Sequence, residues 1–524
     1  MKKYIFILLV LLIPAFSLML RPGIFTMHDF HPFRQYEFSQ CVAAKTFPCR
    51  WAPDAGMGYG EPVFNFYGQF PYWVGQIFHS LGLQIIDSVK ANFILTIIVS
   101  AVGMYLLGKK YWGNLGGMIA ALFYIYAPYR AVDVWVRGSL NEAYALALFP
   151  FIFLSLDNFL DDHQPRHLWW LVFFASALLI THNLSALMIA PFLAIWVFKK
   201  FPVPFSRLIA AAAAVFLLSA FYLLPVIFES RLVTLNLTTS SYYNYQLHWT
   251  TLKQLFISRF WGYGGSVWGP NDTMSFSVGY LQWIIPIFIA LFLLLKYLTH
   301  RPSPIIGEGI KGRGIKELVL FIMFGFFAVF LTHGKSEFIW KLFPPLAYIQ
   351  FPWRFLAVST FFLSLSSGAI SQVFSKKILS LLIILVILIN FSFFRPDIWR
   401  SIGDKEQFSG ALWDEQRSSA LQDFWPKTAK QLPTGFAPRL PQVLLTTDTY
   451  QKIQYPIVYF PGWKSQVELF PSGPLGLITA RVPLGTQINL KFTNTPIRTI
   501  GNITSLVALL CLILSGYYLL PRRV

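Results

Sequence analysis

A short polar segment beside the first apolar run of the chain contains residue types suited to acid–base and phosphate chemistry. Its sequence is Met27-His28-Asp29-Phe30-His31-Pro32-Phe33-Arg34. Asp29 can act as a general base, while His28 and His31 can bind a phosphate or help to hold a divalent metal. Arg34 adds a positive charge that suits a phosphate. A solvated loop without any chemical role fits these residues as well, so the segment alone does not establish a site.

A second charged segment lies between two apolar runs. It reads Arg137-Gly138-Ser139-Leu140-Asn141-Glu142 and follows shortly after Arg130 and Asp133. Charges at the mouth of a membrane helix are costly unless they are paired or used. Glu142 begins an apolar run, where a carboxylate also stabilises the helix dipole. A functional and a purely structural role for Arg137 and Glu142 therefore carry equal weight.

Three single residues are further candidates for binding a phosphate or a substrate. His182, in Thr181-His182-Asn183, lies between two apolar runs, where it equally fits a hydrogen-bonded connector. Arg354 begins an apolar run after Phe351-Pro352-Trp353; it suits bidentate phosphate contact but also snorkelling to the interface. Arg259 precedes an aromatic and glycine-rich stretch. Aromatic side chains in such loops stack on sugars or form an interfacial belt.

The elements that must position these residues are apolar helices. Hydrophobic residues make up 55% of the chain and charged residues only 12%, whereas soluble proteins carry about 25% charged residues. We expect an all-α polytopic membrane protein of about 12 transmembrane helices, because that many apolar runs are long enough to cross a bilayer. The expected spans, the first of them uncleaved, are 4–20, 91–107, 114–131, 143–158, 167–181, 184–198, 207–226, 279–298, 317–333, 352–372, 377–394 and 502–520.

Basic residues are expected to set the orientation of these helices. With the N-terminus in the cytoplasm, every predicted inner junction is basic, as the positive-inside rule requires. The formal net charge of +19 is then explained by the basic residues at the inner ends of the helices. No nucleic-acid-binding motif accompanies it. Both termini are predicted to be cytoplasmic, and the loops 21–90 and 227–278 extracytoplasmic.

The C-terminal part is expected to fold outside the membrane. Short β-rich runs alternate with turn signals after residue 443, which predicts a small antiparallel β-sandwich. We expect three parts. They are a transmembrane domain over 1–394, an extracytoplasmic mixed or β-rich domain over 395–501, and a final helix with a basic cytoplasmic tail over 502–524.

Three local features of the predicted outer side stay more open. The stretch 70–87 is apolar but too interrupted to span, so it is expected to form an interfacial or re-entrant helix. The stretch 404–425 is expected to be helical. Cys41 and Cys49 share the first outer loop, either as one disulfide or as two free thiols.

All candidate residues fall on the same predicted outer side. A pocket there would combine a carboxylate, imidazoles, arginines and aromatic walls beside lipid. The carboxylate would take a hydroxyl proton, and the arginines would stabilise a departing phosphate as its charge develops. This chemistry suits a reaction between a lipid-phosphate donor and an acceptor hydroxyl.

The same motifs resemble a known family over nearly the whole chain. Together with Gly58-Tyr59-Gly60-Glu61-Pro62 and Phe460-Pro461-Gly462-Trp463, they are similar to the 6-pyruvoyl-tetrahydropterin synthase-related membrane proteins, which look like GT-C-type glycosyltransferases. The resemblance implies that Asp29 is the first-loop acid, acting as base or metal-site carboxylate, and that the donor is a polyprenyl-phosphate-linked sugar. Many such enzymes have a paired acidic motif in this loop. Here the neighbour is His28, so a divalent metal at His28 and Asp29 stays open.

We therefore expect a GT-C-like membrane glycosyltransferase that works on the extracytoplasmic face. Its partners would be the lipid bilayer, a polyprenyl-phosphate sugar and a glycan or protein acceptor. A transporter or flippase of lipid-linked sugars is one alternative, although such proteins usually carry mid-span charges and inverted repeats. A non-catalytic scaffold that displays the β-rich tail is the other. Nothing in the sequence matches the zinc site of the soluble pterin enzyme.

Overall fold

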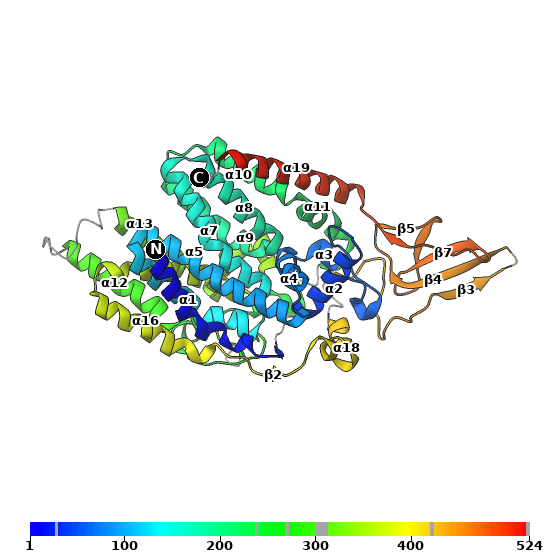
Figure 1. Cartoon of the computed structure of the whole chain (residues 1–524), viewed down its shortest axis with the longest axis horizontal. Helices are drawn as coiled ribbons and strands as arrows, with labels where there is room; N and C mark the ends of the chain where they lie inside the picture. Colours follow the sequence, from blue (N-terminus) through cyan, green and yellow to red (C-terminus); the bar gives the residue numbers. More distant parts are fainter. Residues whose placement is uncertain are drawn as a thin grey trace. The chain divides into compact units, whose positions relative to one another are not determined.

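The computed structural model describes residues 1–26, 30–235, 239–267, 272–298, 313–419, 424–447 and 449–519. Within these ranges the chain is mainly helical, with a small β-rich region near the C-terminus (Figure 1). The helices are α1 (Lys2–Phe16), α2 (His31–Ala43), α3 (Val63–Phe66), α4 (Phe70–Ser80), α5 (Ile85–Ile125), α6 (Pro128–Ala131), α7 (Leu140–Asp162), α8 (Pro165–Thr181), α9 (Asn183–Lys199), α10 (Phe205–Leu218), α11 (Ala220–Glu229), α12 (Tyr280–Leu298), α13 (Arg313–Leu331), α14 (Glu337–Leu342), α15 (Leu356–Ser367), α16 (Lys376–Asn390), α17 (Asp404–Gln407), α18 (Gly410–Ser419) and α19 (Pro496–Leu519).

Every predicted apolar span coincides with helical structure in the described residues. The runs 91–107 and 114–131 both lie mainly in α5, which is two helices joined at a kink. Gly113 forms this kink with φ 73° and ψ −177°, a conformation that glycine adopts readily because it has no Cβ. The apolar pattern therefore located the helices, while a single glycine decided where two of them meet.

The number of membrane spans differs from the expectation. Six helical segments among the described residues are long and apolar enough to cross a membrane, or seven if α10 and α11, which meet at a bend of 75°, form one broken span. The six are Lys2–Leu20, Ile85–Ile125, Leu140–Asp162, Pro352–Gln372, Lys376–Phe393 and Pro496–Tyr518. Helices α8 and α9 are too short to count, and α5 counts once although it holds two expected spans. The predicted count of about 12 is therefore not confirmed.

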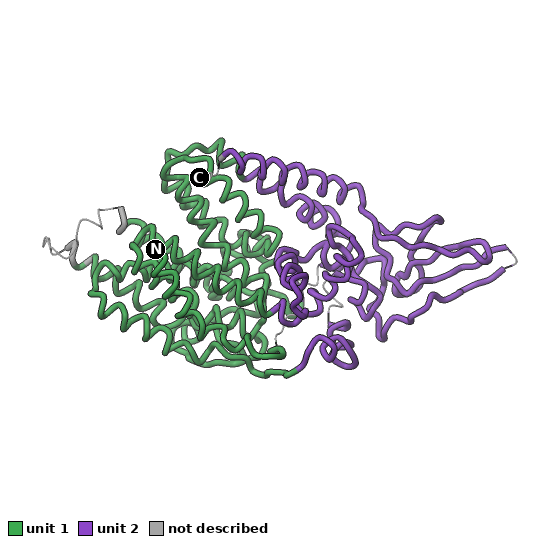
Figure 2. Tube along the Cα trace, viewed as in Figure 1, with its two compact units in different colours: residues 1–29, 90–211, 241–401 green, residues 30–89, 212–240, 402–524 purple. Residues whose placement is uncertain are grey.

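One compact unit consists of residues 1–29, 90–211 and 241–401, coloured green in Figure 2. In its interior α7 packs against α8 and α9, and α15 packs against α12 and α13. The rings of Phe153, Phe361 and Phe362 meet there with centroids 4.8–5.9 Å apart. Strands β1 (Ile24–Phe25) and β2 (Trp399–Arg400) pair antiparallel and tie the segment after α1 to the segment after α16.

The other unit consists of residues 30–89, 212–240 and 402–524, coloured purple in Figure 2. It contains a four-stranded antiparallel sheet in the order β3-β4-β7-β6 and a two-stranded sheet, β5-β8. The strands are β3 (Gln442–Thr446), β4 (Tyr450–Val458), β5 (Trp463–Lys464), β6 (Leu469–Ser472), β7 (Leu477–Pro483) and β8 (Lys491–Phe492). The predicted β-rich tail with antiparallel pairing is confirmed. The division of the chain into membrane, extracytoplasmic and tail parts stays a prediction.

The three open features of the sequence have the following outcomes. Helix α4 covers the first part of the stretch 70–87. Its placement at the membrane surface stays a prediction. Helices α17 and α18 cover 404–419 as expected, while 420–423 lie outside the described residues. Cys41 and Cys49 are joined by a disulfide, and the thiol of Cys511 is free.

Candidate functional site

The first-loop motif is described only from its second half onward. His28 and Asp29 lie outside the described residues, so their predicted roles stay predictions. His31 opens α2 and is fully buried, with its Nδ1 atom 2.8 Å from the hydroxyl of Tyr72. One turn later, the guanidinium of Arg34 lies 4.3 Å from the centre of the Tyr67 ring. Aromatic side chains thus hold both predicted binding residues in place.

A buried carboxyl group lies about one turn further along α2. Glu37 is fully buried, and its Oε2 accepts a hydrogen bond of 3.2 Å from the backbone N–H of Asp54. Among the described residues its Oε1 has no hydrogen-bond partner. Burial raises the pKa of Glu37 well above its usual range, and the negative charge of Asp54 raises it further. Sequence reasoning missed this residue, because a lone glutamate on a mixed helix gives no signal.

We expect Glu37→Gln to make the stability of the protein less dependent on pH. Because the pKa of Glu37 is higher in the folded than in the unfolded chain, the folded protein holds this proton more tightly. Its contribution to stability is complete below the unfolded pKa of about 4.3 and is lost as pH rises toward the folded pKa. Thermal unfolding of the wild type and of Glu37→Gln from pH 4 to 9 measures this. An unchanged slope in Glu37→Gln, with exposed Glu415→Gln as control, would refute it.

The second charged segment forms a compact cluster. After α6, a turn of π-helix over Val132–Val136 leads to Arg137, and Gly138 turns the chain with φ 61° into α7. In the π-helical turn Asp133 and Arg137 lie side by side, with Arg137 Nη1 3.0 Å from Asp133 Oδ1. Such turns are frequent where a helix must re-aim a side chain. The local sequence therefore places a fully buried aspartate beside an arginine at the entrance to α7.

Glu142 is the carboxylate that joins the cluster together. It lies in the first turn of α7, is fully buried, and receives Arg137 Nη1 at 2.7 Å. The hydroxyl of Tyr129 donates a hydrogen bond to its other oxygen. Arg354, more than two hundred residues further along the chain, brings its Nε atom to 3.8 Å from Glu142. Three predicted site residues, Arg137, Glu142 and Arg354, thus come together.

Arg130 adds another positive charge beside the cluster. It is fully buried and donates to Ser100 Oγ at 2.7 Å and to the carbonyl of Thr96 at 3.1 Å. Its charge acts on Asp133. Among the described residues, this group holds three guanidinium groups and two carboxyl groups. Charged residues in membrane proteins are normally paired or used, and several arginines gathered at one place suit an anionic ligand.

The surroundings of Asp133 favour the protonated form of its carboxyl group. Burial raises its pKa well above the usual range, and the negative charge of Glu142 raises it further, against the opposing effect of Arg137. Its Oδ2 atom has no hydrogen-bond partner among the described residues. A protonated Asp133 fits this environment, because a neutral carboxyl costs less to bury than a carboxylate. Glu142 then stands as the counter-ion of the guanidinium groups.

Aromatic rings border the same cluster. The guanidinium of Arg137 lies 4.8 Å from the centre of the Trp353 ring, and that of Arg354 lies 5.1 Å from the centre of the Phe351 ring. Trp353 donates its indole N–H to Ser266 Oγ at 3.1 Å. His248 hydrogen-bonds the same hydroxyl at 2.9 Å. The described part of the loop after α11 therefore packs against the segment that precedes α15.

His248 is a second residue that sequence reasoning missed. Its other ring nitrogen, Nε2, lies 2.6 Å from the carbonyl of Tyr242, and its ring packs on Phe351 at 4.6 Å. Burial lowers the pKa of His248, and the positive charge of Arg354 lowers it further. A neutral imidazole is therefore favoured at pH 7. The residue lies in an aromatic loop without a local motif, so only the tertiary fold relates it to the cluster.

Two predicted binding residues remain: His182 lies near the start of α7, and Arg259 lies beside the end of α16. Asn141 donates a hydrogen bond of 2.7 Å to the carbonyl of Thr181, which anchors the His182 connector to the start of α7. The charge of His182 acts on Glu142, and its Nδ1 lies 2.6 Å from Ser185 Oγ. Arg259 is exposed and donates to the carbonyl of Ile389 at the end of α16. Its contacts among the described residues, with Ile389, Tyr280 and Phe393, lie outside the cluster.

A comparison with protein families matches residues 64–396 to the model described as "6-pyruvoyl-tetrahydropterin synthase related domain; membrane protein". The match covers more than half of the chain. The protein belongs to this family. It is therefore an integral membrane protein, and the region that the family model covers contains the whole Arg137–Glu142–Arg354 cluster. No curated protein matches the chain.

Among solved structures, the chain is similar to the arabinofuranosyltransferase AftD from Mycobacteria. One AftD structure has 12% sequence identity and a TM-score of 0.49, over 79% of this chain and 28% of AftD. A mutant form has 11% identity and a TM-score of 0.48, over 77% of this chain and 29% of AftD. This member of the 6-pyruvoyl-tetrahydropterin synthase related family thus spans less than a third of AftD.

A metal site is not found in the part of the family member that the structure describes. No group of three His, Cys, Asp or Glu side chains there could hold a metal ion. Because His28 and Asp29 lie outside the described residues, the predicted metal site at these two positions stays a prediction.

We expect Asp133→Asn to fold normally. If Asp133 is protonated, the neutral amide replaces a neutral carboxyl of the same shape and still accepts the hydrogen bond of Arg137. The free energy of unfolding should then change by less than about 1 kcal/mol. Thermal unfolding in nanodiscs measures this, with Asp133→Ala, which removes the acceptor, as the destabilised comparison. Equal losses in Asp133→Asn and Asp133→Ala would show that Asp133 is needed as an anion.

Proposed function

We propose that the protein is a GT-C-like membrane glycosyltransferase that moves a sugar from a polyprenyl-phosphate-linked donor to a glycan or protein acceptor on the extracytoplasmic face. In this reaction an acceptor hydroxyl attacks the anomeric carbon of the sugar. The bond between that carbon and the phosphate oxygen breaks, and polyprenyl phosphate leaves with the bonding electrons. A general base takes the hydroxyl proton, which keeps atoms and charges in balance.

The observation that carries the proposal is the gathering of three arginines around the buried carboxyl groups of Asp133 and Glu142. Arg130, Arg137 and Arg354 lie around Glu142 and Asp133, and Asp133 favours its neutral form. Arginine suits a phosphate because its planar fork matches two phosphate oxygens. Donors of this kind, fixed before the reaction, stabilise the charge that develops on a leaving phosphate. The aromatic rings of Phe351 and Trp353 fit the apolar face of a sugar.

The base and the side of the membrane rest on the sequence. Asp29 is proposed as the base because it matches the first-loop acid of the resembling enzymes. His28, His31, Arg34, His182 and Arg259 are proposed to assist donor binding. The predicted orientation places these residues, the tail 395–501 and the Cys41–Cys49 disulfide on the extracytoplasmic side. A disulfide in this loop supports that placement, because disulfides persist mainly in oxidising compartments.

An Asp29→Asn variant tests the proposed base. The full-length protein in nanodiscs receives pooled polyprenyl-phosphate sugars and a membrane extract as the source of acceptor, with and without a divalent metal. Release of polyprenyl phosphate is measured. We expect release by the wild type and a loss of roughly 10²-fold or more in Asp29→Asn, the range of general base catalysis. Full activity of Asp29→Asn would refute the base but keep the enzyme.

A further inference from the structure

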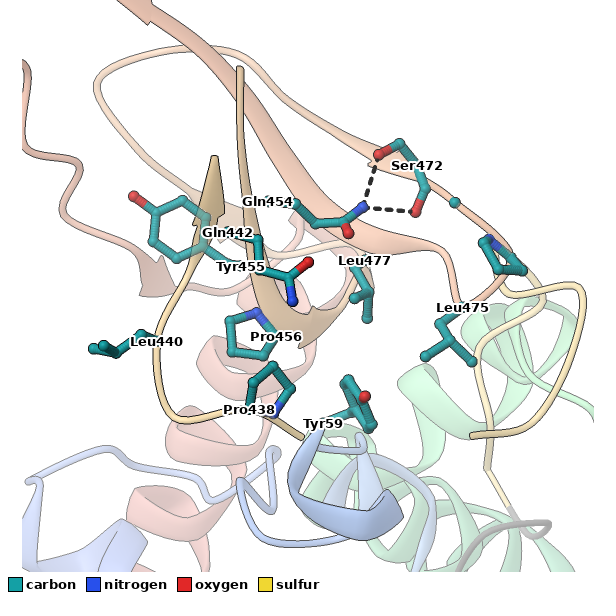
Figure 3. A pocket seen from close by; sticks show the side chains of 12 residues that line it. Tyr59, Pro438, Leu440, Gln442, Gln454, Tyr455, Pro456, Ser472, Leu475 and Leu477 are labelled. Carbon is teal, nitrogen blue, oxygen red and sulfur yellow. Dashed lines mark hydrogen bonds between the residues drawn. The ribbon is translucent and has the colours of Figure 1, made fainter. Parts of the chain in front are cut away.

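A groove of about 250 Å³ lies beside the four-stranded sheet, entirely within the second unit (Figure 3). Its walls come from β4, from the segment leading into β3, from the end of β6 and from the turn around Tyr59. This volume is somewhat below the roughly 300 Å³ at which small-molecule sites begin. A groove of this size suits one or two units of a longer chain.

The chemistry of the lining indicates the kind of ligand. None of the described residues that line the groove is charged. Rings and branched apolar side chains alternate with amides and a hydroxyl, as in Tyr59, Pro438, Pro456, Leu477, Gln442 and Gln454. We infer that this groove binds a neutral oligosaccharide, whose C–H faces contact the apolar rings and whose hydroxyls hydrogen-bond the two glutamines. The described residues that line the groove offer no counter-charge to an acidic or phosphorylated ligand.

The turn that presents Tyr59 is an unusual piece of backbone. The residues Gly56, Met57, Gly58 and Gly60 all have positive φ, between 58° and 86°. For Met57 this conformation is uncommon, and such backbone is found preferentially at functional sites. Backbone hydrogen bonds hold the turn on the tail: Val458 N–H donates to the Tyr59 carbonyl, and Ala437 N–H donates to the Met57 carbonyl, both at 2.9 Å. The motif is thus fixed with the Tyr59 ring at the groove.

Two glutamines offer hydrogen-bonding groups that the fold does not use. Gln454 donates through Nε2 to the backbone carbonyl and the hydroxyl of Ser472, at 3.3 Å and 3.0 Å, which fixes its amide. No described residue hydrogen-bonds its Oε1 or the amide of Gln442. Figure 3 shows both amides beside the space that Tyr59, Pro438, Pro456 and Leu477 surround. A fixed acceptor and an adaptable amide at the edge of an apolar surface are the arrangement that recognises sugar hydroxyls.

A proline-rich peptide is the other ligand that an uncharged groove with aromatic and proline rings could take. Such peptides dock mainly on parallel aromatic rings with few fixed polar groups. Here only Tyr59 and Tyr455 are aromatic, and the ring of Tyr455 points away from the space in Figure 3. The fixed Gln454 amide favours hydroxyl groups. The inference does not depend on transferase activity, because binding is measured without a sugar donor.

Isothermal titration calorimetry on the full-length protein in nanodiscs tests the groove. The probes are neutral tetra- to hexasaccharides built from hexoses and from pentoses, an oligogalacturonate of the same length, and a proline-rich decapeptide. We expect binding of at least one neutral oligosaccharide. Gln442→Ala, at an exposed position, should weaken this binding roughly fivefold, and Gln442→Ala with Gln454→Ala roughly tenfold or more. The exposed Gln487→Ala should bind as the wild type does.

Three results would overturn the inference. They are binding of the decapeptide alone, binding of no probe at all, and binding of a neutral oligosaccharide that neither glutamine substitution weakens. Tyr59→Phe adds a check that keeps the ring in place: it should retain at least part of the binding, because the ring contacts the sugar face. If the protein transfers sugar normally but the groove binds no neutral oligosaccharide, the inference about the groove is wrong and the proposed transferase site still stands. If the groove binds an oligosaccharide as expected but no sugar is transferred, the inference about the groove still stands.

Discussion

Replacing Arg137 by alanine is expected to lower the rate of sugar transfer by about 10²–10³-fold, the cost of losing one group that stabilises developing charge. Arg137 is central because its Nη1 atom contacts both Asp133 and Glu142. Its guanidinium also lies over Trp353. The proposed leaving phosphate would therefore lose one positively charged donor. The initial rate of polyprenyl phosphate release, with saturating donor, measures the effect.

Two further variants separate chemistry from folding. Arg137→Lys keeps the positive charge but loses the planar fork, so we expect it to fold and to lose transfer by roughly tenfold or more. Arg395→Ala removes an exposed arginine of the same unit and should transfer at the wild-type rate. Thermal unfolding of each variant is measured in parallel. Wild-type transfer by a well-folded Arg137→Ala would exclude the cluster from the reaction.

Glu229→Gln is expected to destabilise the protein by about 3–5 kcal/mol, the cost of leaving a buried charge without its partner. Glu229 ends α11 and lies 2.8 Å from Nε of Arg498, which is fully buried at the start of α19. The amide of Asn65 and the hydroxyl of Thr495 also donate to Glu229, at 2.8 Å and 2.6 Å. Without this carboxylate, Arg498 would keep its charge in an apolar setting.

The same substitution also affects Arg50. This buried arginine donates to Asn65 at 3.1 Å and to Asn502 at 2.8 Å, and the charge of Glu229 compensates its own. The shift in thermal unfolding temperature relative to exposed Glu468→Gln measures the loss. A double variant, Glu229→Met with Arg498→Met, should be less destabilised than Glu229→Gln, because it removes both partners of the ion pair. A Glu229→Gln protein as stable as the control would contradict this account.

Much of the helical framework follows from the sequence. Apolar runs predicted helices at α7, α15 and α19, because a bilayer requires about 20 apolar residues in a row. The number of spans did not follow. The number of spans depends on helix length, because length alone separates a spanning helix from a short apolar one. In addition, two expected spans meet at Gly113 within the single helix α5. The β-rich tail was predicted from alternating runs and turns, while its strand order depends on pairings distant in sequence.

The candidate site was predictable only in part. The contact between Arg137 and Glu142 is local, and both residues belong to the charged segment that the sequence already indicated as a candidate site. That Arg354 joins them was suggested only by its predicted position on the same side of the membrane. His248 and the pair Glu229–Arg498 gave no local signal, because their partners lie elsewhere in the chain. The roles of all these residues in the reaction stay predictions.

The most direct test of the central claim is transfer of a labelled sugar from polyprenyl phosphate by the purified full-length protein. Wild type, Arg137→Lys and Arg395→Ala are compared in nanodiscs, with a membrane extract as acceptor and release of polyprenyl phosphate as the second readout. We predict transfer by the wild type and by Arg395→Ala, and a loss of roughly tenfold or more in Arg137→Lys. Transfer that Arg137→Lys leaves unchanged, or its absence in the wild type with every donor and acceptor, would contradict the proposed glycosyltransferase.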